Sequence, residues 1–342
     1  ASNPAYKRGR RLQLLQMLVL PFIPILALIV QTGITLNDII IYRQEVSDIE
    51  TQVTIATDLG KVVTQMQLER SEVAFFIFTN GSQLRSGLQH RFSQTNQSLN
   101  NMITWPPVQI PESEGRAVLL DNKSTFLDRL NKFRSNISSE ESSMTEVLHW
   151  YTSVNAALLD HLTNQIKETD NSGVWRYLVS FKNLLRSIEN IGIAMVYGIN
   201  YFARGKLYNS SYIHYVRHEA LGNDLLNSSL NFVPSLRLLY KDLTRRMKDY
   251  GDIKRRKEAI IQNHSRNKSD TDAEVYFDSM ASYVDELRTL QQELRVKIRN
   301  YVNSNLLEAS HKEAYGIAIL VLVLVVSPII IILVHNAVAT IQ

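Results

Sequence analysis

The sequence has no cysteine among its 342 residues, and only 8 prolines and 13 glycines. The lack of cysteine excludes disulfides, thiolate metal sites and cysteine nucleophiles. A domain without disulfides must be held by its hydrophobic core, and a chain of this length is large enough for one. The formal net charge is +4. Basic residues near the N-terminus account for as much as this total, so the charge gives no reason to expect a nucleic-acid partner.

Proline is absent between Pro111 and Pro234, which permits long helices throughout that stretch. Three prolines cluster in residues 105–111, and this cluster predicts a loop.

Long apolar runs are present at both ends of the chain, over residues 14–36 and 314–334. About 20 apolar residues span the hydrocarbon thickness of a membrane as a helix. The second run has no charged residue and predicts a transmembrane helix. The first contains Pro21 and Pro24, which membrane helices tolerate. A cleaved signal peptide is the alternative for the first run, but its length favours a retained anchor.

The charges that flank the first run predict its orientation. Four basic residues precede it and Arg43 alone follows closely, so the positive-inside rule places the N-terminus in the cytoplasm. Two spans then make residues 37–313 extracellular and return the C-terminus to the cytoplasm. We therefore expect a plasma-membrane protein with a cytoplasmic segment at 1–13 and a cytoplasmic signalling linker that starts at 335–342.

Asn-X-Ser sequons support this topology, because all of them fall between the two runs and their number exceeds chance. We expect glycosylation in the secretory pathway, with these side chains on exposed faces or loops. The candidate sites are Asn80, Asn96, Asn122, Asn136, Asn209, Asn227, Asn263 and Asn267.

The region between the runs is predicted to be helical. The first helix should continue from the membrane to Phe78, because its apolar residues recur every three or four positions and Asn80-Gly81 follows. The last should run unbroken from Asp272 into the second span. Between them, helices are expected at about 84–102, 116–134, 137–170, 174–202, 212–231 and 234–263. This pattern predicts an all-α fold of two up-down four-helix bundles, over residues 37–171 and 172–313, between two transmembrane helices.

No pattern of catalytic residues is present: there is no phosphate-binding glycine loop, zinc-protease motif or nucleophile elbow. We expect no enzymatic activity, cofactor or metal in this chain. His214 and His218, four residues apart, fall on one helical face, but two histidines lack the third ligand that metal sites normally need. A solvated helix is the simpler interpretation.

The most informative polar residues are Gln67 and Arg70, which lie three apart beside an apolar stripe on the first helix. An arginine in that position must be paired. Its planar fork suits a planar oxyanion such as a carboxylate or nitrate. An ion pair with Glu69, Glu72 or a carboxylate of a neighbouring helix is the alternative interpretation.

Gln67-x-Glu69-Arg70 on the first long helix after a membrane anchor resembles the signature of the NIT domain, a nitrate- and nitrite-sensing domain. The resemblance covers about residues 52–301, and residues 184–205 echo the first half with an arginine, an acidic residue, aromatics and a glycine stop. It implies two helical bundles and a nitrate- or nitrite-like ligand near Arg70 and Gln67, with Arg186 or Arg204 as further ligand-binding residues.

The resemblance also implies a signalling output outside this chain. In its sequons and its final residues the chain resembles animal receptors that join a NIT domain to a guanylyl cyclase, so we expect such a cyclase after Gln342. We also expect a homodimer, by analogy with other signalling helices that cross a membrane once. The sensor of a histidine kinase or chemoreceptor has the same fold and remains an alternative. A helical adhesion or scaffold glycoprotein, without a ligand, is a further one.

Overall fold

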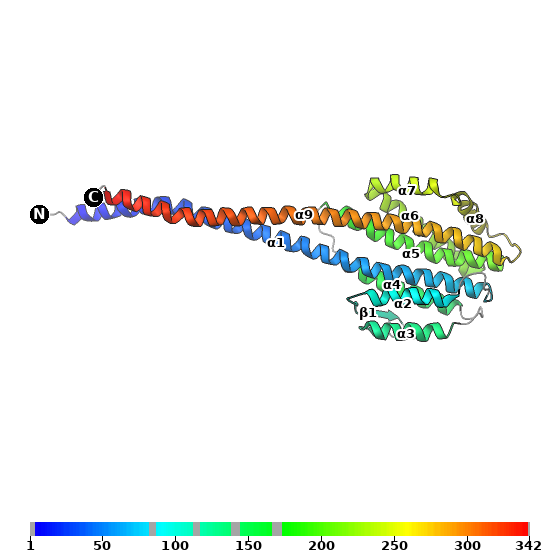
Figure 1. Cartoon of the computed structure of the whole chain (residues 1–342). Helices are drawn as coiled ribbons and strands as arrows, with labels where there is room; N and C mark the ends of the chain where they lie inside the picture. Colours follow the sequence, from blue (N-terminus) through cyan, green and yellow to red (C-terminus); the bar gives the residue numbers. More distant parts are fainter. Residues whose placement is uncertain (1–3, 82–86, 112–116, 138–143, 166–172, 341–342) are drawn as a thin grey trace. The chain divides into compact units, whose positions relative to one another are not determined.

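The computed structural model describes residues 4–81, 87–111, 117–137, 144–165 and 173–340, and it is an all-α fold with one small hairpin (Figure 1). Its described elements are α1 (Pro4–Phe78), α2 (Leu88–Asn101), β1 (Val108–Pro111), β2 (Ala117–Leu120), α3 (Lys123–Ser135), α4 (Met144–Gln165), α5 (Trp175–Arg204), α6 (Asn209–Phe232), α7 (Pro234–Arg246), α8 (Tyr250–Gln262) and α9 (Asp270–Thr340). The chain divides into two units, residues 1–50 with 301–342 and residues 51–300.

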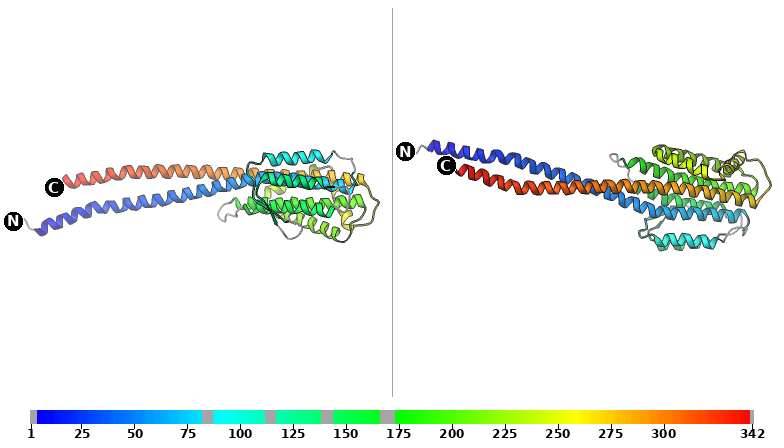
Figure 2. Two further views of the ribbon diagram at one scale, coloured as in Figure 1. Left: turned by 90° about the horizontal axis from the view of Figure 1, so that it is seen from below. Right: turned by 45° about the horizontal axis from the view of Figure 1, so that its top comes forward.

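The first unit consists of the N-terminal part of α1 and the C-terminal part of α9, which lie side by side (Figures 1 and 2). A Cβ added at Gly316 would lie 3.1 Å from Leu36 Cδ1, so the two helices are in close contact there. Arg43 and Glu313 form an ion pair at 2.7 Å. Both helices contain a segment long and apolar enough to cross a membrane, and most large apolar side chains of these segments are exposed.

The second unit is built around two central helices. Residues 56–78 of α1 are buried on most of their circumference, and 19 residues of α5 are buried. Phe75 of α1 meets Phe277 of α9 edge to face, with ring centroids 5.7 Å apart. Helix α6 packs along α5, and a Cβ at Gly222 would lie 2.7 Å from an Ile191 side-chain carbon. The central part of α1 therefore meets neighbours on several sides, which explains how polar residues on it become buried.

Several helix ends follow the sequence prediction. Helix α1 ends at Phe78, where Asn80 and Gly81 take positive φ values of 51° and 77° and Gly81 N–H donates to Phe76 O at 2.7 Å. Helix α5 ends before Gly205, whose φ is 89°. Helix α9 continues without interruption through the second apolar run, as predicted. Parts of the helices predicted at 84–102 and 137–170 lie outside the described residues.

The prediction of a loop at 105–111 and a helix from 116 was wrong in part. Residues 108–111 and 117–120 form an antiparallel hairpin in which Val108 is opposite Leu120. Both of these side chains are buried, so alternation of apolar residues outweighed helical periodicity here. Helix α3 starts only at Lys123, after Asn122 caps it by accepting a hydrogen bond from Ser124 N–H at 3.0 Å.

The predicted helix at 234–263 is interrupted. Met247 leaves the helical conformation, with ψ at 113°, and α8 begins only at Tyr250. The residues that follow, Asp249 and Gly251, are poor helix formers, which favours a break at this point.

Candidate functional site

Two adjacent residues of α1, Glu69 and Arg70, each form a separate buried ion pair. Arg70 has no exposed side-chain surface, and its Nη1 and Nη2 donate to the two carboxylate oxygens of Glu189 on α5 at 2.7 and 3.3 Å. Gln67 Nε2 donates to the same carboxylate at 2.7 Å. Gln67 and Arg70 thus hold a planar oxyanion between them, and that oxyanion is a side chain of the protein.

The guanidinium of Arg70 is only partly satisfied. Its Nη1 also donates to Thr152 Oγ1 at 3.4 Å, but its buried Nε has no hydrogen-bond partner among the described residues. The Nε and Nη2 nitrogens form the side edge of the guanidinium, a second edge that can grip an oxyanion with two parallel bonds. A Cβ at Gly192 would lie 3.0 Å from Nη2, so the absence of a side chain there gives the guanidinium room.

The neighbouring pair, Glu69 with Arg134 of α3, is complete. Arg134 Nε and Nη2 donate to the Glu69 carboxylate at 2.8 and 2.7 Å, and Tyr151 O–H donates to it at 2.6 Å. Arg134 Nη1 donates to Asn96 Oδ1 at 2.7 Å. Burial raises the pKa of Tyr151 well above its usual value, and the nearby Glu69 charge adds to this, so the phenol stays a donor.

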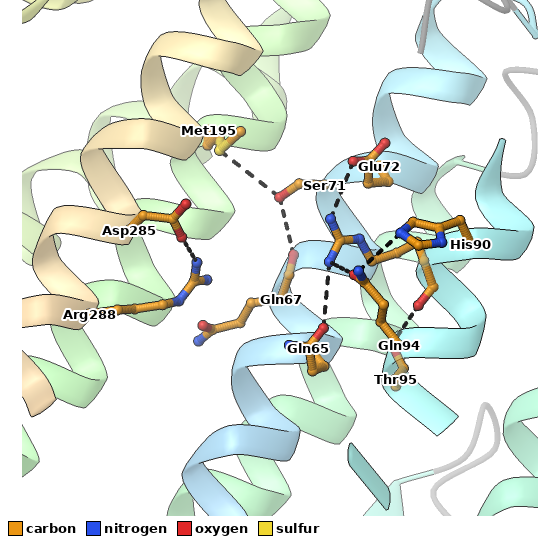
Figure 3. A network of polar contacts seen from close by, with 11 residues as sticks. Gln65, Gln67, Ser71, Glu72, His90, Gln94, Thr95, Met195, Asp285 and Arg288 are labelled. Carbon is orange, nitrogen blue, oxygen red and sulfur yellow. Dashed lines mark hydrogen bonds and ion pairs between the residues drawn. The ribbon is translucent and has the colours of Figure 1, made fainter. Parts of the chain in front are cut away.

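Polar contacts continue along α1 on either side of these pairs (Figure 3). Ser71 O–H donates to Gln67 O at 3.1 Å and approaches the Met195 sulfur at 4.0 Å. Gln65 and Glu72 face α2, where they meet Arg91 at 3.5 and 3.7 Å. This part of α1 is therefore held to its neighbours by polar side-chain contacts as well as by apolar packing.

A cavity of about 380 Å³ lies between the end of α1 and helices α4, α5 and α6. Thr152 lines it and also accepts the N–H of Arg70, which joins the cavity to the ion pair. No carboxylate is among the described side chains that line it. These are Phe78, Met144, Thr145, Leu148, His149, Thr152, Ile193, Tyr197, Asn200, Ser210, Ser211, His214 and His218.

Three histidines, His149, His214 and His218, line this cavity. His214 stacks on Tyr197 and on His218, with ring centroids 5.8 and 6.2 Å apart. His218 Nδ1 lies 2.8 Å from Asn190 Oδ1. Burial lowers the pKa of His218, and the neighbouring His214 lowers it further, so its imidazole is uncharged at neutral pH. Within the described residues, no group of three potential ligands is arranged to hold a metal ion.

Comparison with protein families decides the identity of this fold. The family model for nitrate and nitrite sensing, NIT, matches residues 61–299, which include Gln67, Arg70, Glu189 and every described cavity residue. The chain belongs to the NIT family. This confirms the family that the Gln67-x-Glu69-Arg70 motif indicated.

A solved structure has a similar fold. The transcription antiterminator NasR is similar in structure, with a TM-score of 0.56 and 13% sequence identity over 80% of this chain and 79% of that chain. At this identity the likeness concerns the fold alone. A comparison with curated proteins gave no match.

The two other arginines that the sequence suggested for the NIT ligand lie elsewhere. Arg186 is exposed on α5, and no described hydrogen bond or ion pair joins it to Arg70 or Gln67. Arg204, at the end of α5, donates to Asn80 Oδ1 at 3.1 Å. It stands 15 residues beyond Glu189, or about 22 Å along the helix axis. The structure thus brings Gln67 and Arg70 together but leaves Arg186 and Arg204 apart from them.

The sequon side chains differ in exposure. Asn80, Asn122, Asn136, Asn209, Asn227 and Asn267 are exposed, whereas Asn96 and Asn263 are half-buried. Asn263 is engaged by the backbone: its Oδ1 accepts Leu207 N–H at 2.9 Å and its Nδ2 donates to Leu207 O at 2.8 Å.

Sequence reasoning missed the residues of this site that come from distant helices. It allowed for a carboxylate on a neighbouring helix but did not identify Glu189 as the partner of Arg70. Thr152 and His149 of α4 gave no signal, because neither stands in a motif. The His214 and His218 pair was noticed for its spacing, yet only the fold shows that both line a cavity close to Arg70.

Proposed function

We propose that this chain is the sensor region of a membrane receptor and that it binds a small planar oxyanion, nitrate or nitrite, at Arg70. The observation that carries the proposal is the incomplete guanidinium. A fully buried Arg70 has an Nε without a described acceptor, and its neighbour Thr152 lines a cavity whose described side chains include no carboxylate. Membership of a nitrate- and nitrite-sensing family supplies the ligand class.

The chemistry of the ligand fits these contacts. Nitrate and nitrite are planar and carry their charge on oxygens spaced like those of a carboxylate, which an arginine edge grips with two N–H donors. The Gln67 and Arg70 donors already hold the carboxylate of Glu189 in this manner. The side edge of Arg70 offers a second position of the same kind. The cavity adds uncharged donors from Thr152, Tyr197 and Asn200.

Binding at Arg70 would move protein groups, and this makes a sensor possible. Arg70 is enclosed and does not line the cavity itself, so an anion that reaches it must shift Thr152 or Glu189. Those residues belong to α4 and α5, and both contact α1. A ligand biases such an arrangement only through different affinities for its two states. The anion supplies that difference, because it binds the state in which the edge of Arg70 is accessible.

Calorimetry on the whole chain in lipid nanodiscs tests the proposal. We expect nitrate or nitrite to bind the wild type, and the double variant Arg70→Met/Glu189→Leu to lose binding. Replacing both partners of a buried ion pair with apolar residues is often neutral or stabilising, so this variant should remain folded. Absence of heat with either anion at millimolar concentration, or unchanged binding in the double variant, would refute the anion site.

The membrane topology is part of the same proposal. Two long apolar helices, basic residues before the first and sequons between them favour two spans with both termini in the cytoplasm. Glycans would then be attached at exposed sequons such as Asn122 and Asn227. Glycosidase added to intact cells should increase the mobility of the protein on a gel. In Asn122→Gln this increase should be smaller by the contribution of one glycan. Full protection of these sites from external enzyme would contradict the topology.

We further propose that the anion signal passes through α9, which contributes residues to the sensor unit and to the second apolar segment. The resemblance to animal receptors supports a guanylyl cyclase output, and analogy with single-span signalling helices, which usually work in pairs, supports a homodimer. The sequence of the gene product after Gln342 tests the output directly, and a kinase or chemoreceptor domain there would replace the cyclase.

A further inference from the structure

An anion added at Arg70 creates a charge problem, and the inference drawn from it rests on the proposed function. Arg70 and Glu189 already neutralise each other in a buried pair. An additional anion on the open edge of Arg70 would leave one net negative charge away from water. An uncompensated buried charge costs several kcal/mol, so tight binding calls for a compensating positive charge nearby.

A group near Arg70 and Glu189 that is able to gain a positive charge is His218. Asn190 Nδ2 donates to Arg186 O at 2.8 Å, which fixes the amide and makes Oδ1 the acceptor for His218 Nδ1. Nδ1 therefore carries the proton, and Nε2 keeps its lone pair. His218 lines the cavity, and it lies close enough to Arg70 and Glu189 for both charges to influence its protonation.

We propose that His218 is a second ligand-binding residue of this cavity, and that its Nε2 takes up one proton from solvent when the anion binds. The N–H bond formed at Nε2 makes the imidazole a cation, which offsets the added negative charge. The site then takes an oxyanion together with a proton. Nitrate and nitrite affinity should accordingly increase as the pH falls.

The other charged and titratable groups around His218 are consistent with this assignment. His214 and Arg217 of α6 and Arg70 of α1 oppose its protonation, whereas Glu189 of α5 favours it. Burial raises the pKa of the Tyr197 phenol, so that group stays neutral. His149 of α4 also lines the cavity. In the empty site the opposing influences and burial keep His218 uncharged, and a bound anion reverses the balance.

Nitrate titrations of the whole chain in nanodiscs, between about pH 5.5 and pH 8 where imidazoles titrate, test the proposal. If one proton is taken up with each anion, the Kd for nitrate should rise with pH by up to about tenfold per pH unit. This rise is confined to the pH range between the pKa of His218 without anion and its pKa with anion bound. Calorimetry in two buffers of different ionisation enthalpy should show uptake of up to one proton per anion. His218→Gln should lose this pH dependence, and His161→Gln, on α4 but outside the cavity, should keep it.

The outcomes separate the two proposals. Loss of nitrate binding to the wild type at every pH would refute the proposed function. Nitrate binding that depends on Arg70 but shows a pH-independent Kd and no proton uptake would overturn the present inference alone. Proton uptake that persists in His218→Gln would also overturn it, because another group would then be the acceptor. If His218→Gln fails to fold, the pKa of His218 followed by NMR in the wild type decides, since nitrate must raise it.

Discussion

Two buried ion pairs start from neighbouring residues of α1, and they differ in how completely they are satisfied. In the pair of Glu69 and Arg134, the carboxylate accepts three hydrogen bonds and the guanidinium also reaches Asn96. In the pair of Arg70 and Glu189, the guanidinium keeps an Nε without a described partner and adjoins a cavity through Thr152. The first has the features of a structural contact and the second those of a site.

The difference shows how one short motif can serve two purposes. Consecutive residues of a helix point about 100° apart, so Glu69 pairs with Arg134 of α3 whereas Arg70 pairs with Glu189 of α5, and each also contacts α4. A buried charge must be paired in either case. Only an incomplete pair leaves donors for a ligand, and the proposed function therefore assigns the ligand to Arg70 and a structural role to Glu69.

The largest effect is expected from breaking the complete pair. Arg134→Met leaves the buried Glu69 carboxylate without its guanidinium, which should lower the free energy of unfolding by about 3–5 kcal/mol. Urea unfolding of the chain in detergent, followed by circular dichroism, measures this loss. Protein that remains folded should bind nitrate with the wild-type Kd, because no ligand contact is proposed on that side of α1.

A matched control is Arg255→Met, which removes an arginine whose side chain is 80% exposed in its ion pair with Asp252. Its effect should stay within about 0.5 kcal/mol, as for other surface changes. If Arg134→Met lowered the affinity for nitrate as strongly as the double variant Arg70→Met/Glu189→Leu does, the division between a structural pair and a sensing pair would be contradicted.

An intermediate effect is expected from Glu189→Gln. Glutamine keeps an acceptor for Arg70 but removes the counter-charge, so stability without ligand should fall by about 1–3 kcal/mol. Nitrate should then bind about 10- to 100-fold more tightly, as expected for charged hydrogen bonds worth about 1.5–3 kcal/mol. Thermal unfolding with and without nitrate measures both effects, because a ligand stabilises the folded state it binds.

The same variant sharpens the role of the proton. With Glu189 uncharged, an anion alone neutralises Arg70, so nitrate binding to Glu189→Gln should no longer take up a proton. Unchanged or weaker nitrate binding in this variant would mean that Glu189 supports the ligand rather than competes with it for Arg70.

The sequence predicted those parts of the fold that depend on local patterns. The helical period and the Asn80-Gly81 stop placed the end of α1, and the lack of proline allowed α5 its full length. Val108 and Leu120 became strand residues because they lie opposite each other in an antiparallel pair of strands, and an expectation based on a proline cluster and helical period could not predict that pairing. Tertiary contact outweighed local preference there.

The site was predictable only in part for the same reason. Gln67 and Arg70 belong to one turn of one helix, so their spacing was visible in the sequence. Glu189 stands 119 residues after Arg70, and no local rule relates the two. Arg186 shares a helix with Glu189 but is exposed, which shows that an arginine in the second half was a weaker guide than the buried carboxylate three residues later.

The smallest effect, and the most specific to the open edge of Arg70, is expected from Gly192→Ala. The new Cβ would lie 3.0 Å from Arg70 Nη2, so the end of that side chain must move by a few tenths of an ångström. Alanine favours the helix by about 0.8–1.0 kcal/mol over glycine. This gain offsets the crowding, and the free energy of unfolding should change by less than about 1 kcal/mol.

Nitrate affinity should nevertheless fall by a few fold in Gly192→Ala, since misplacing one charged hydrogen bond costs about 1 kcal/mol or more. Gly251→Ala is the matched control, because no atom lies within 4 Å of a Cβ at that exposed position of α8. It should leave the Kd unchanged. Equal nitrate affinity in both variants would place the ligand on another face of Arg70, whereas a loss confined to Gly192→Ala would locate it at the edge that Glu189 leaves open.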